Sequence, residues 1–220
     1  MKHPLIAMSL LLSPLWLSSM GGSSIAFAAP TSVLPSDQQA GQILTSSPHA
    51  LVAAAMDRTT HNVRYDGRYI SIPYPNGDVP ADIGVCTDVV IRSYRQLGID
   101  LQRLVHEDMR QHFSLYPSKR IWGLTRTDRN IDHRRVPNLQ VFFQRHGVSL
   151  PISHEAKQYQ PGDIVTWMLP GNLPHIGIIV DKWSDDGKRP LVVHNIGRGP
   201  VLEDMLFDYT ITGRYQYQPE

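Results

Sequence analysis

The order of the periodic segments constrains the fold of this chain more than any single motif does. In several segments before Gly147 the apolar residues recur every three or four positions, which is the spacing of one helix face. After Pro161 short β-branched runs alternate with turn residues, which is typical of strands. Helices first and an antiparallel meander second predict an α+β fold, in which N-terminal helices pack on a small antiparallel sheet.

Capping and turn signals place the individual elements. Ser47 precedes a first-turn proline, Asp100 precedes an apolar periodic run, and Gly98 and Gly147 stop two helices. No period survives over 113–135, so we expect a long ordered loop there, and such loops are often functional. We expect helices at 48–56, 86–97, 101–109 and 137–146, extended segments with a turn over 63–75, and strands at 164–167, 174–180, 191–194 and 211–217.

The N-terminus has the pattern of a secretory signal. Lys2 precedes an apolar run over 5–17, and Ala26-Phe27-Ala28 forms a cleavage site after Ala28. Polar residues interrupt the run, which therefore falls short of the ~20 apolar residues of a membrane span. We expect a periplasmic or secreted protein with a signal peptide at 1–28, a flexible arm at 29–46 and one domain at 47–220, without stable membrane insertion.

The charge balance argues against one class of partner. The chain has 21 Lys and Arg and 20 Asp and Glu, and Lys2 is the only one of these in the expected signal peptide. The mature chain is therefore formally neutral, which disfavours nucleic-acid binding through bulk positive charge.

The only cysteine, Cys86, stands at the opening of the predicted helix 86–97. Backbone N–H groups and the helix dipole favour the thiolate there, so we expect a reactive thiol. An exported protein with one cysteine has no disulfide partner within the chain, so the thiol is either buried or used. The alternative is a small buried hydrophobe. Asp88 lies within the same turn and opposes the thiolate unless it caps the helix or is paired.

Two histidines are candidates for activating this thiol. His175 opens one predicted strand and His194 ends the neighbouring one, so the two rings can meet across an antiparallel pair, where Cβ atoms lie ~5 Å apart. We expect His175 to act as the base and His194 to orient it, with Asn195 as the rival third member. His106 and His112 are six positions apart, which does not match a His-Glu-x-x-His zinc helix, and no cofactor is implied.

These segments in this order resemble the NlpC-type peptidoglycan endopeptidases, which have a papain-like fold. The resemblance rests on the cysteine at a helix start, on Pro-Gly-Asp-Ile-Val at 161–165, on His-Ile-Gly-Ile-Ile-Val at 175–180 and on the strand ending in His194. It implies that Tyr74 helps to shape an oxyanion pocket. A narrower resemblance, through 84–88, 130–139 and 193–197, is to the secreted bacterial YijF-like family of unknown function.

The densest polar cluster of the chain lies between the cysteine and the histidines. It contains Asp132, Arg134 and Arg135, and an arginine fork suits the carboxylates of a peptide stem. We expect these residues and Asn195 to bind substrate. The alternative is a salt-bridged loop that braces itself against the core.

The function implied is that of an exported cysteine hydrolase. It would cleave an amide bond in peptidoglycan stem peptides through Cys86, His175 and His194 and an acyl-enzyme. Two alternatives remain open: an acyltransferase or transpeptidase with the same triad, and a non-catalytic cell-wall-binding domain in which Cys86 is buried.

Overall fold

The computed structural model of the chain describes residues 47–219. The expected signal peptide at 1–28 and flexible arm at 29–46 lie outside the described residues. None of the helices within 47–219 is long and apolar enough to cross a membrane.

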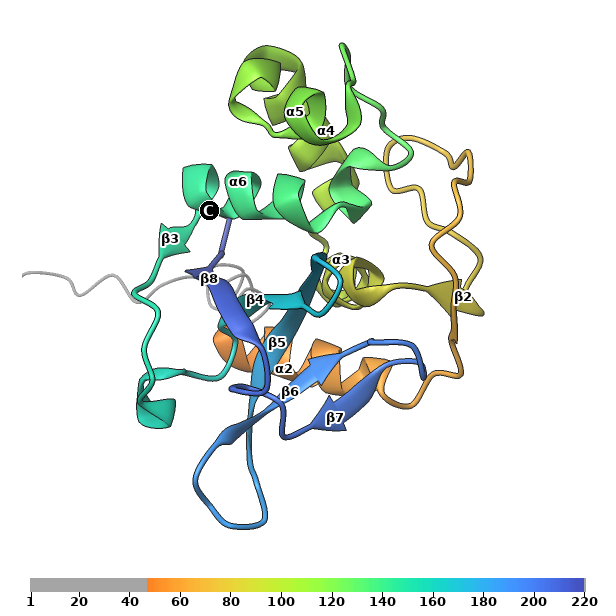
Figure 1. Ribbon diagram of the computed structural model, residues 1–220. Helices are drawn as coiled ribbons and strands as arrows, with labels where there is room; N and C mark the ends of the chain where they lie inside the picture. The colour runs from red at the N-terminus through yellow and green to blue at the C-terminus, as the bar shows by residue number, and fades with distance from the viewer. Residues whose placement is uncertain (1–46, 220) are drawn as a thin grey trace, which may run out of the picture. The chain divides into compact units, whose positions relative to one another are not determined.

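The centre of the structure is a six-stranded antiparallel sheet with the order β3-β8-β4-β5-β6-β7 (Figure 1). The strands β4, β5 and β6 confirm the three strands expected over 164–194. Each is a short run of Ile, Val and Trp bounded by turn residues, which suits a strand buried on both faces. The six strands are β3 (Val148–Ser149), β4 (Ile164–Leu169), β5 (Leu173–Trp183), β6 (Pro190–His194), β7 (Val201–Glu203) and β8 (Thr210–Gln216).

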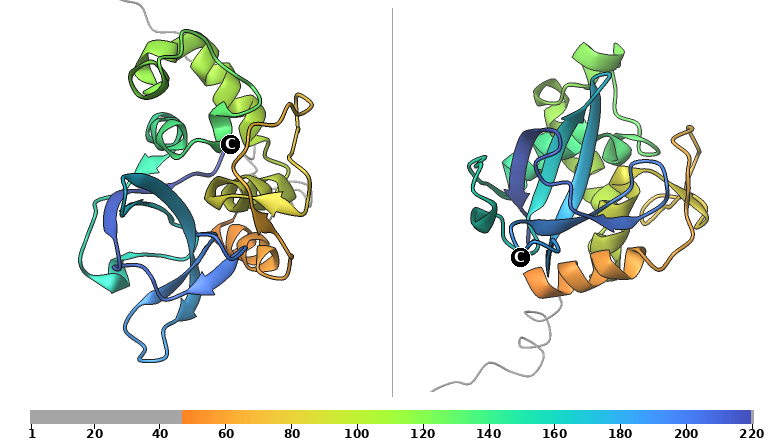
Figure 2. Two further views of the ribbon diagram at one scale, coloured as in Figure 1. Left: turned by 45° about the vertical axis from the view of Figure 1, so that its right-hand side comes forward. Right: turned by 60° about the horizontal axis from the view of Figure 1, so that its bottom comes forward.

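The four predicted helices are confirmed, and they lie on one side of this sheet: three of them pack on β5, and the helix over 101–112 packs on two of the other helices (Figure 2). Ser47 and Asp100 cap two of them as expected, because their side chains accept the N–H groups of Ala50 and Arg103. The helices are α2 (Pro48–Arg58), α3 (Cys86–Gln96), α4 (Leu101–His112) and α6 (Val136–His146). The α+β prediction, with the cysteine helix on an antiparallel sheet, is therefore confirmed.

The packing against the two sheet faces differs in size. Val89, Val90 and Tyr94 of α3 pack with Phe142 and Phe143 of α6 in the larger core. The opposite face carries a smaller core, in which Trp167 and Ile179 contact Leu206. Because side chains alternate along a strand, β5 contributes Ile176 and Ile178 to the first core and Ile179 to the second.

Three features differ from the sequence-based expectations. The segment 113–135 is not a plain loop, since it contains η1 (Phe113–Leu115), α5 (Ser118–Trp122) and η2 (Asp132–Arg134). These elements are too short to show a period. The last strand, β8, returns to pair with β4 instead of extending the series β4 to β7. The extended segment over 63–75 holds only β1 (Arg64–Tyr65), which pairs in parallel with β2 (Ile83–Gly84).

A buried ion pair fastens the segment before α6 to the start of the cysteine helix. The guanidinium of Arg134 makes two 2.9 Å hydrogen bonds to the carboxylate of Asp88, and both side chains are almost fully buried. Asp88 also accepts the backbone N–H of Val85, which caps α3. In addition, Thr87 donates to the carbonyl of Arg134. The first turn of α3 and the residues leading into α6 are therefore held as one unit.

We predict that Arg134→Met lowers the free energy of unfolding by about 3–5 kcal/mol, because it leaves the Asp88 carboxylate buried without its cation. Urea unfolding measures this change. The double variant Asp88→Asn/Arg134→Met should be more stable than Arg134→Met alone. Arg64→Met, at an exposed ion pair, is the control and should cost less than about 1 kcal/mol. Equal losses at Arg134 and Arg64 would contradict the prediction.

Candidate active site

Cys86 is the first residue of α3, directly after the short strand β2 and the extended residue Val85. The backbone N–H groups of Cys86, Thr87 and Ile176 lie close enough to Sγ to favour the thiolate. Ile176 belongs to β5 and follows His175. Folding therefore places the sulfur against β5, at the residue that follows His175.

Burial nevertheless decides the state of the thiol. Cys86 is only 5% exposed, and loss of solvation raises the pKa of the thiol to about 12, outweighing the N–H groups. The charge of Asp88 raises it further. The sequence-based expectation of a reactive thiolate is therefore wrong for the resting protein, in which Cys86 carries its proton.

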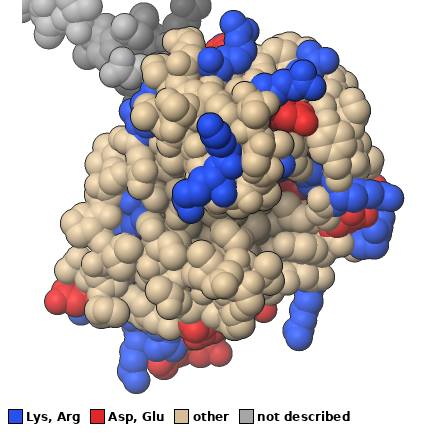
Figure 3. Space-filling model, turned by 45° about the horizontal axis from the view of Figure 1, so that its top comes forward, with Lys and Arg blue, Asp and Glu red and all other residues tan. Residues whose placement is uncertain are grey.

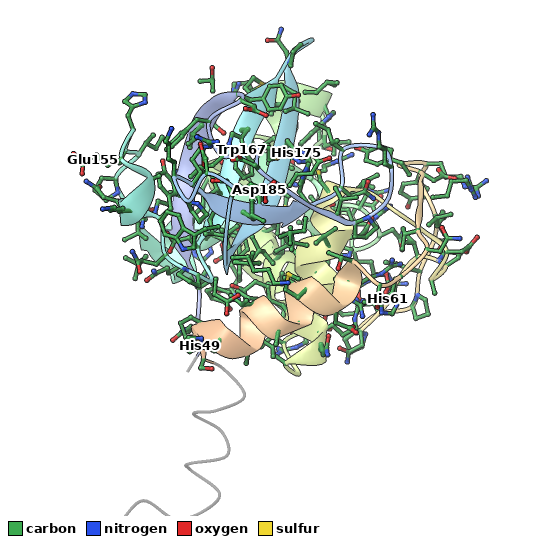
Figure 4. The ribbon with its side chains drawn as sticks, turned by 90° about the horizontal axis from the view of Figure 1, so that it is seen from below. His49, His61, Glu155, Trp167, His175 and Asp185 are labelled. Atoms are coloured by element: carbon green, nitrogen blue, oxygen red, sulfur yellow. The ribbon has the colours of Figure 1, made fainter. Side chains whose placement is uncertain are left out.

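The two predicted histidines are in contact. Nε2 of His175 lies 2.9 Å from Nδ1 of His194, and the rings meet edge to face. Trp167 lies opposite His175 on β4, with the two ring centres 6.0 Å apart (both are labelled in Figure 4). Gly177 makes room for the pair, because a Cβ there would lie 2.7 Å from Val192 and 3.1 Å from the Cβ of His194.

A fourth residue, Glu203, extends this chain of contacts. Its carboxylate lies 2.9 Å from Nε2 of His194, and its own side chain is partly exposed. Sequence reasoning missed Glu203 because β7 has only three residues. The Gly199-Pro200 turn was the available signal: a hairpin there sets Val201 opposite His194 and brings Glu203 to the same face as that histidine.

These contacts determine where the protons of the two rings lie. Burial lowers the pKa of both histidines, that of His175 to about 3, so both are neutral near pH 7. A carboxylate only accepts, so Nε2 of His194 carries a hydrogen, and its Nδ1 then accepts from Nε2 of His175. Nδ1 of His175 is left as an unprotonated acceptor without a hydrogen-bond partner among residues 47–219. It is the nitrogen that can take a proton.

Tyr74 does not lie at this site. Its ring stacks edge-on against His106 of α4, and the charges that act on it belong to Glu107, Asp100 and nearby arginines. Tyr65 is the tyrosine that interacts electrostatically with the thiol, although 44% of it is exposed. Its pKa is raised to about 12 by partial burial first, and then by the charges that an ionised Cys86 and Asp88 carry. Pairing of β1 with β2 brings it there, a contact that no spacing along the chain reveals.

The other predicted substrate-binding residues are mostly structural. Arg134 is occupied by Asp88, and Asp132 is buried where it accepts the N–H of Asp128. Asn195 is buried too and lies against the carbonyl of Gly84. The bracing alternative therefore describes Arg134 and Asp132 better than substrate binding does.

Arg135 differs from these residues because it keeps an exposed part. Its guanidinium lies 4.1 Å from the centre of the Trp122 ring, and its side chain is 19% exposed. Arg135 therefore remains a candidate for contact with substrate. Within 47–219 no group of three His, Cys, Asp or Glu side chains is arranged to hold a metal ion.

We predict that His175 makes the stability of the protein depend on pH. Its pKa in the folded state, about 3, lies below the ordinary value of 6.5, so the unfolded chain binds the extra proton. The free energy of unfolding should therefore fall as the pH drops from about 6.5 toward 3, by up to about 1.4 kcal/mol per pH unit for each such group. His133, whose pKa burial also lowers to about 3, contributes in the same direction.

Denaturant unfolding at several pH values tests this. His175→Gln should give a shallower dependence on pH, whereas His154→Gln, at an exposed ring, should keep the slope of the unsubstituted protein. An unchanged slope in His175→Gln would show that His175 is not buried in its neutral form.

We predict that Tyr65 shields the sulfur. Removing the ring in Tyr65→Ala should admit water and lower the pKa of Cys86, and each unit of that decrease raises the thiolate fraction about tenfold. The rate of alkylation by iodoacetamide at pH 7, followed by mass spectrometry, should rise accordingly from a slow value. Tyr69→Ala, which removes another exposed tyrosine of the same segment, is the control. Equal rates in the two variants would rule out shielding by Tyr65.

Comparison with known proteins identifies the family. Residues 52–217 match a family described as "Domain of unknown function (DUF1287)". The "Uncharacterized protein YijF" of Escherichia coli (strain K12) is 48% identical over 176 residues, which are 80% of this chain and 84% of that protein. The YijF-like resemblance is thereby confirmed.

Among solved structures, NlpC1 from Trichomonas vaginalis is similar with a TM-score of 0.42 and 15% sequence identity. The match covers 79% of this chain but only 45% of that one, so this chain spans less than half the length of its structural neighbour. At this level of similarity the neighbour says nothing about the activity of this chain. The match over 52–217 and the identity with YijF do show the family: this chain belongs to the DUF1287 family.

Proposed function

We propose that this protein is an exported cysteine hydrolase that cleaves an amide bond in peptidoglycan stem peptides through an acyl-enzyme. The observation that supports this most directly is the ordered series of contacts from Glu203 through His194 to His175, together with the backbone N–H of Ile176, the residue after His175, at the sulfur of Cys86. A nucleophile, a base beside it and a group that orients the base are the parts that acyl transfer needs.

The reaction would begin from the neutral thiol. Nδ1 of His175 takes the proton of Cys86 as Sγ attacks the carbonyl carbon of the amide. The backbone N–H of Cys86, at the start of α3, donates to the oxyanion. His175 then returns the proton to the leaving amine, and a thioester remains on Cys86. Water activated by His175 hydrolyses the thioester, which releases the carboxylic acid and restores the thiol.

His194 and Glu203 would act by fixing the tautomer of His175. If the Glu203 carboxylate is lost, a neutral His194 is free to place its proton on Nδ1, which reverses the donor and acceptor roles between the rings. Nδ1 of His175 then carries the hydrogen and has no lone pair for the thiol proton. Tyr65, beside the sulfur, replaces Tyr74 as the candidate tyrosine of the oxyanion pocket.

The cellular setting follows from the N-terminal pattern. A basic residue, an apolar run and Ala26-Phe27-Ala28 support export to the periplasm or beyond, where the cell wall is accessible. The neutral mature chain supports a peptide substrate over nucleic acid. The chemistry proposed uses groups of the protein and water.

A second candidate function is favoured by the burial of the thiol. A non-catalytic wall-binding domain needs no accessible sulfur, and Cys86 is 5% exposed with a raised pKa. In that case Cys86→Ala leaves wall binding intact, and there is no turnover to lose. The hydrolase, in contrast, would lose its turnover in Cys86→Ala and in His175→Ala.

We predict that the purified protein releases soluble muropeptides from sacculi, measured by chromatography and mass spectrometry. Cys86→Ala and His175→Ala should abolish release. Glu203→Gln should lower kcat at least about a hundredfold with little change in KM, because it disturbs the base and not substrate binding; tautomer loss at a catalytic histidine has effects of this size or larger.

Glu155→Gln is the matched control, since Glu155 is exposed and lies away from His175 (Figure 4). Turnover that rises with an added amine acceptor, without hydrolysis, would identify the transferase instead. Equal release by the protein and by Cys86→Ala would refute the proposed chemistry.

A further inference from the structure

We propose that the open groove between α5, α6 and β8 binds a carboxylate-bearing peptide segment of the substrate. This inference rests on the proposed function for the identity of the substrate, but the groove itself is a separate feature. Neither Cys86 nor either histidine of the pair lines it.

The groove is large enough for several residues of a peptide. Its volume is about 930 Å³, and its walls are α5 and the residues before it on one side and α6 and β8 on the other. Prolines and aliphatic side chains form part of the lining, so the surface is not uniformly polar. The polar lining residues that carry the inference are Lys119, Arg120, Gln140, Gln144 and Thr212.

The charged residues that line the groove are all basic. Lys119 and Arg120 are exposed at the groove, and neither has an acidic partner among residues 47–219. No Asp or Glu lines the groove. Asp108, which accepts the hydroxyl of the lining residue Tyr116, is held by Arg145. In Figure 3, which shows the molecule with its top turned forward, Lys and Arg side chains outnumber acidic ones over the upper part of the surface.

The floor of the groove offers amide and hydroxyl groups. Nε2 of Gln140 donates to the hydroxyls of Thr166 and Thr212, which themselves lie 3.0 Å apart. These bonds hold the Gln140 side chain in one orientation between α6 and the sheet. Gln144 follows one turn later on the same helix face. Because Nε2 of Gln140 already donates twice, Gln140 offers its Oε1 as an acceptor for a peptide N–H.

The register of the sheet relates this floor to Cys86. Thr166 pairs with Ile176, whose N–H faces Sγ, and on its other side with Gly213, next to Thr212. Neighbouring strands lie about 4.8 Å apart, so Thr166 and Thr212 lie one and two strand spacings, about 5 and 10 Å, from β5. The sulfur lies on the other side of β5, so an extended peptide needs at least about four residues to reach from the floor of the groove to it. The groove also begins at the N-terminal end of α6, which the Thr87–Arg134 contact holds beside α3.

Three features of the groove match an acidic peptide. Its charged lining residues are all basic, its floor holds amide groups in fixed positions, and a peptide of a few residues would reach from it to Cys86. The occupant would be the part of the stem peptide that carries free carboxylates. Lys119 and Arg120 would bind these carboxylates, and Gln140 and Gln144 would contact the peptide backbone.

The test measures binding without turnover. Full-length mature protein carrying Cys86→Ala is titrated by calorimetry with a synthetic tetrapeptide, Ala-γ-Glu-diaminopimelyl-Ala, and with the same peptide in which every carboxylate is an amide. We expect the acidic peptide to bind, and to bind about tenfold more weakly when Lys119→Gln and Arg120→Gln are added, since two exposed charge pairs together contribute about that factor. The exchange Lys119→Arg with Arg120→Lys should restore binding.

Lys157→Gln with Lys182→Gln removes the same charge from exposed positions elsewhere and should leave the affinity unchanged. The groove proposal is overturned if the acidic peptide does not bind, if the amidated peptide binds equally well, if both double variants weaken binding alike, or if the uncharged tetramer of N-acetylglucosamine competes for the groove. Binding lost in the groove variant, with no release from sacculi by unsubstituted protein, would support the groove and refute the hydrolase. Release from sacculi with an unchanged KM in the groove variant would support the hydrolase and refute the groove.

Discussion

The buried carboxylate of Asp88 is the group on which the geometry of this site depends. It caps α3 through the N–H of Val85 and holds Arg134 through two hydrogen bonds. The first role fixes the turn from which Cys86 projects. The second brings the start of α6, and with it one wall of the groove, beside the cysteine helix. Loss of the pair would therefore disturb the surroundings of Cys86 and the groove together, although Asp88 lines neither the groove nor the histidine pair.

The candidate site combines a strongly buried thiol with a histidine nitrogen that is free of its proton. Burial opposes charge on Cys86, His175 and His194 alike, so the resting site is neutral. In a site without charged rings or thiolate, the hydrogen-bond roles of the groups depend on which nitrogen of each ring carries the hydrogen. One partly exposed carboxylate, that of Glu203, sets the tautomers of two rings and leaves Nδ1 of His175 as the acceptor. The charge that appears during attack would meet the backbone N–H groups already aimed at the sulfur.

Several parts of this site could be predicted because they depend on local signals. Cys86 at a helix start, and His175 and His194 on adjoining strands, follow from capping residues and from strand alternation, and the structure confirms these positions. Tyr65 and Glu203 could not be assigned in this way, since each reaches the site through a strand of two or three residues that carries no period. Arg134 was wrongly assigned to substrate because a sequence does not show whether a guanidinium is already paired.

The sequence by itself determined the order of helices and strands, the position of the single thiol and the pair of histidines, because hydrophobic periodicity and turn chemistry act over a few neighbouring residues. Only the tertiary structure decided whether Cys86 is charged, which tyrosine stands beside it, which carboxylate orients the histidines and which cations remain free for a ligand. These properties depend on solvation and on contacts between residues far apart in the chain. Burial, which outweighs the helix start at Cys86, exists only once the sheet and the helices have packed.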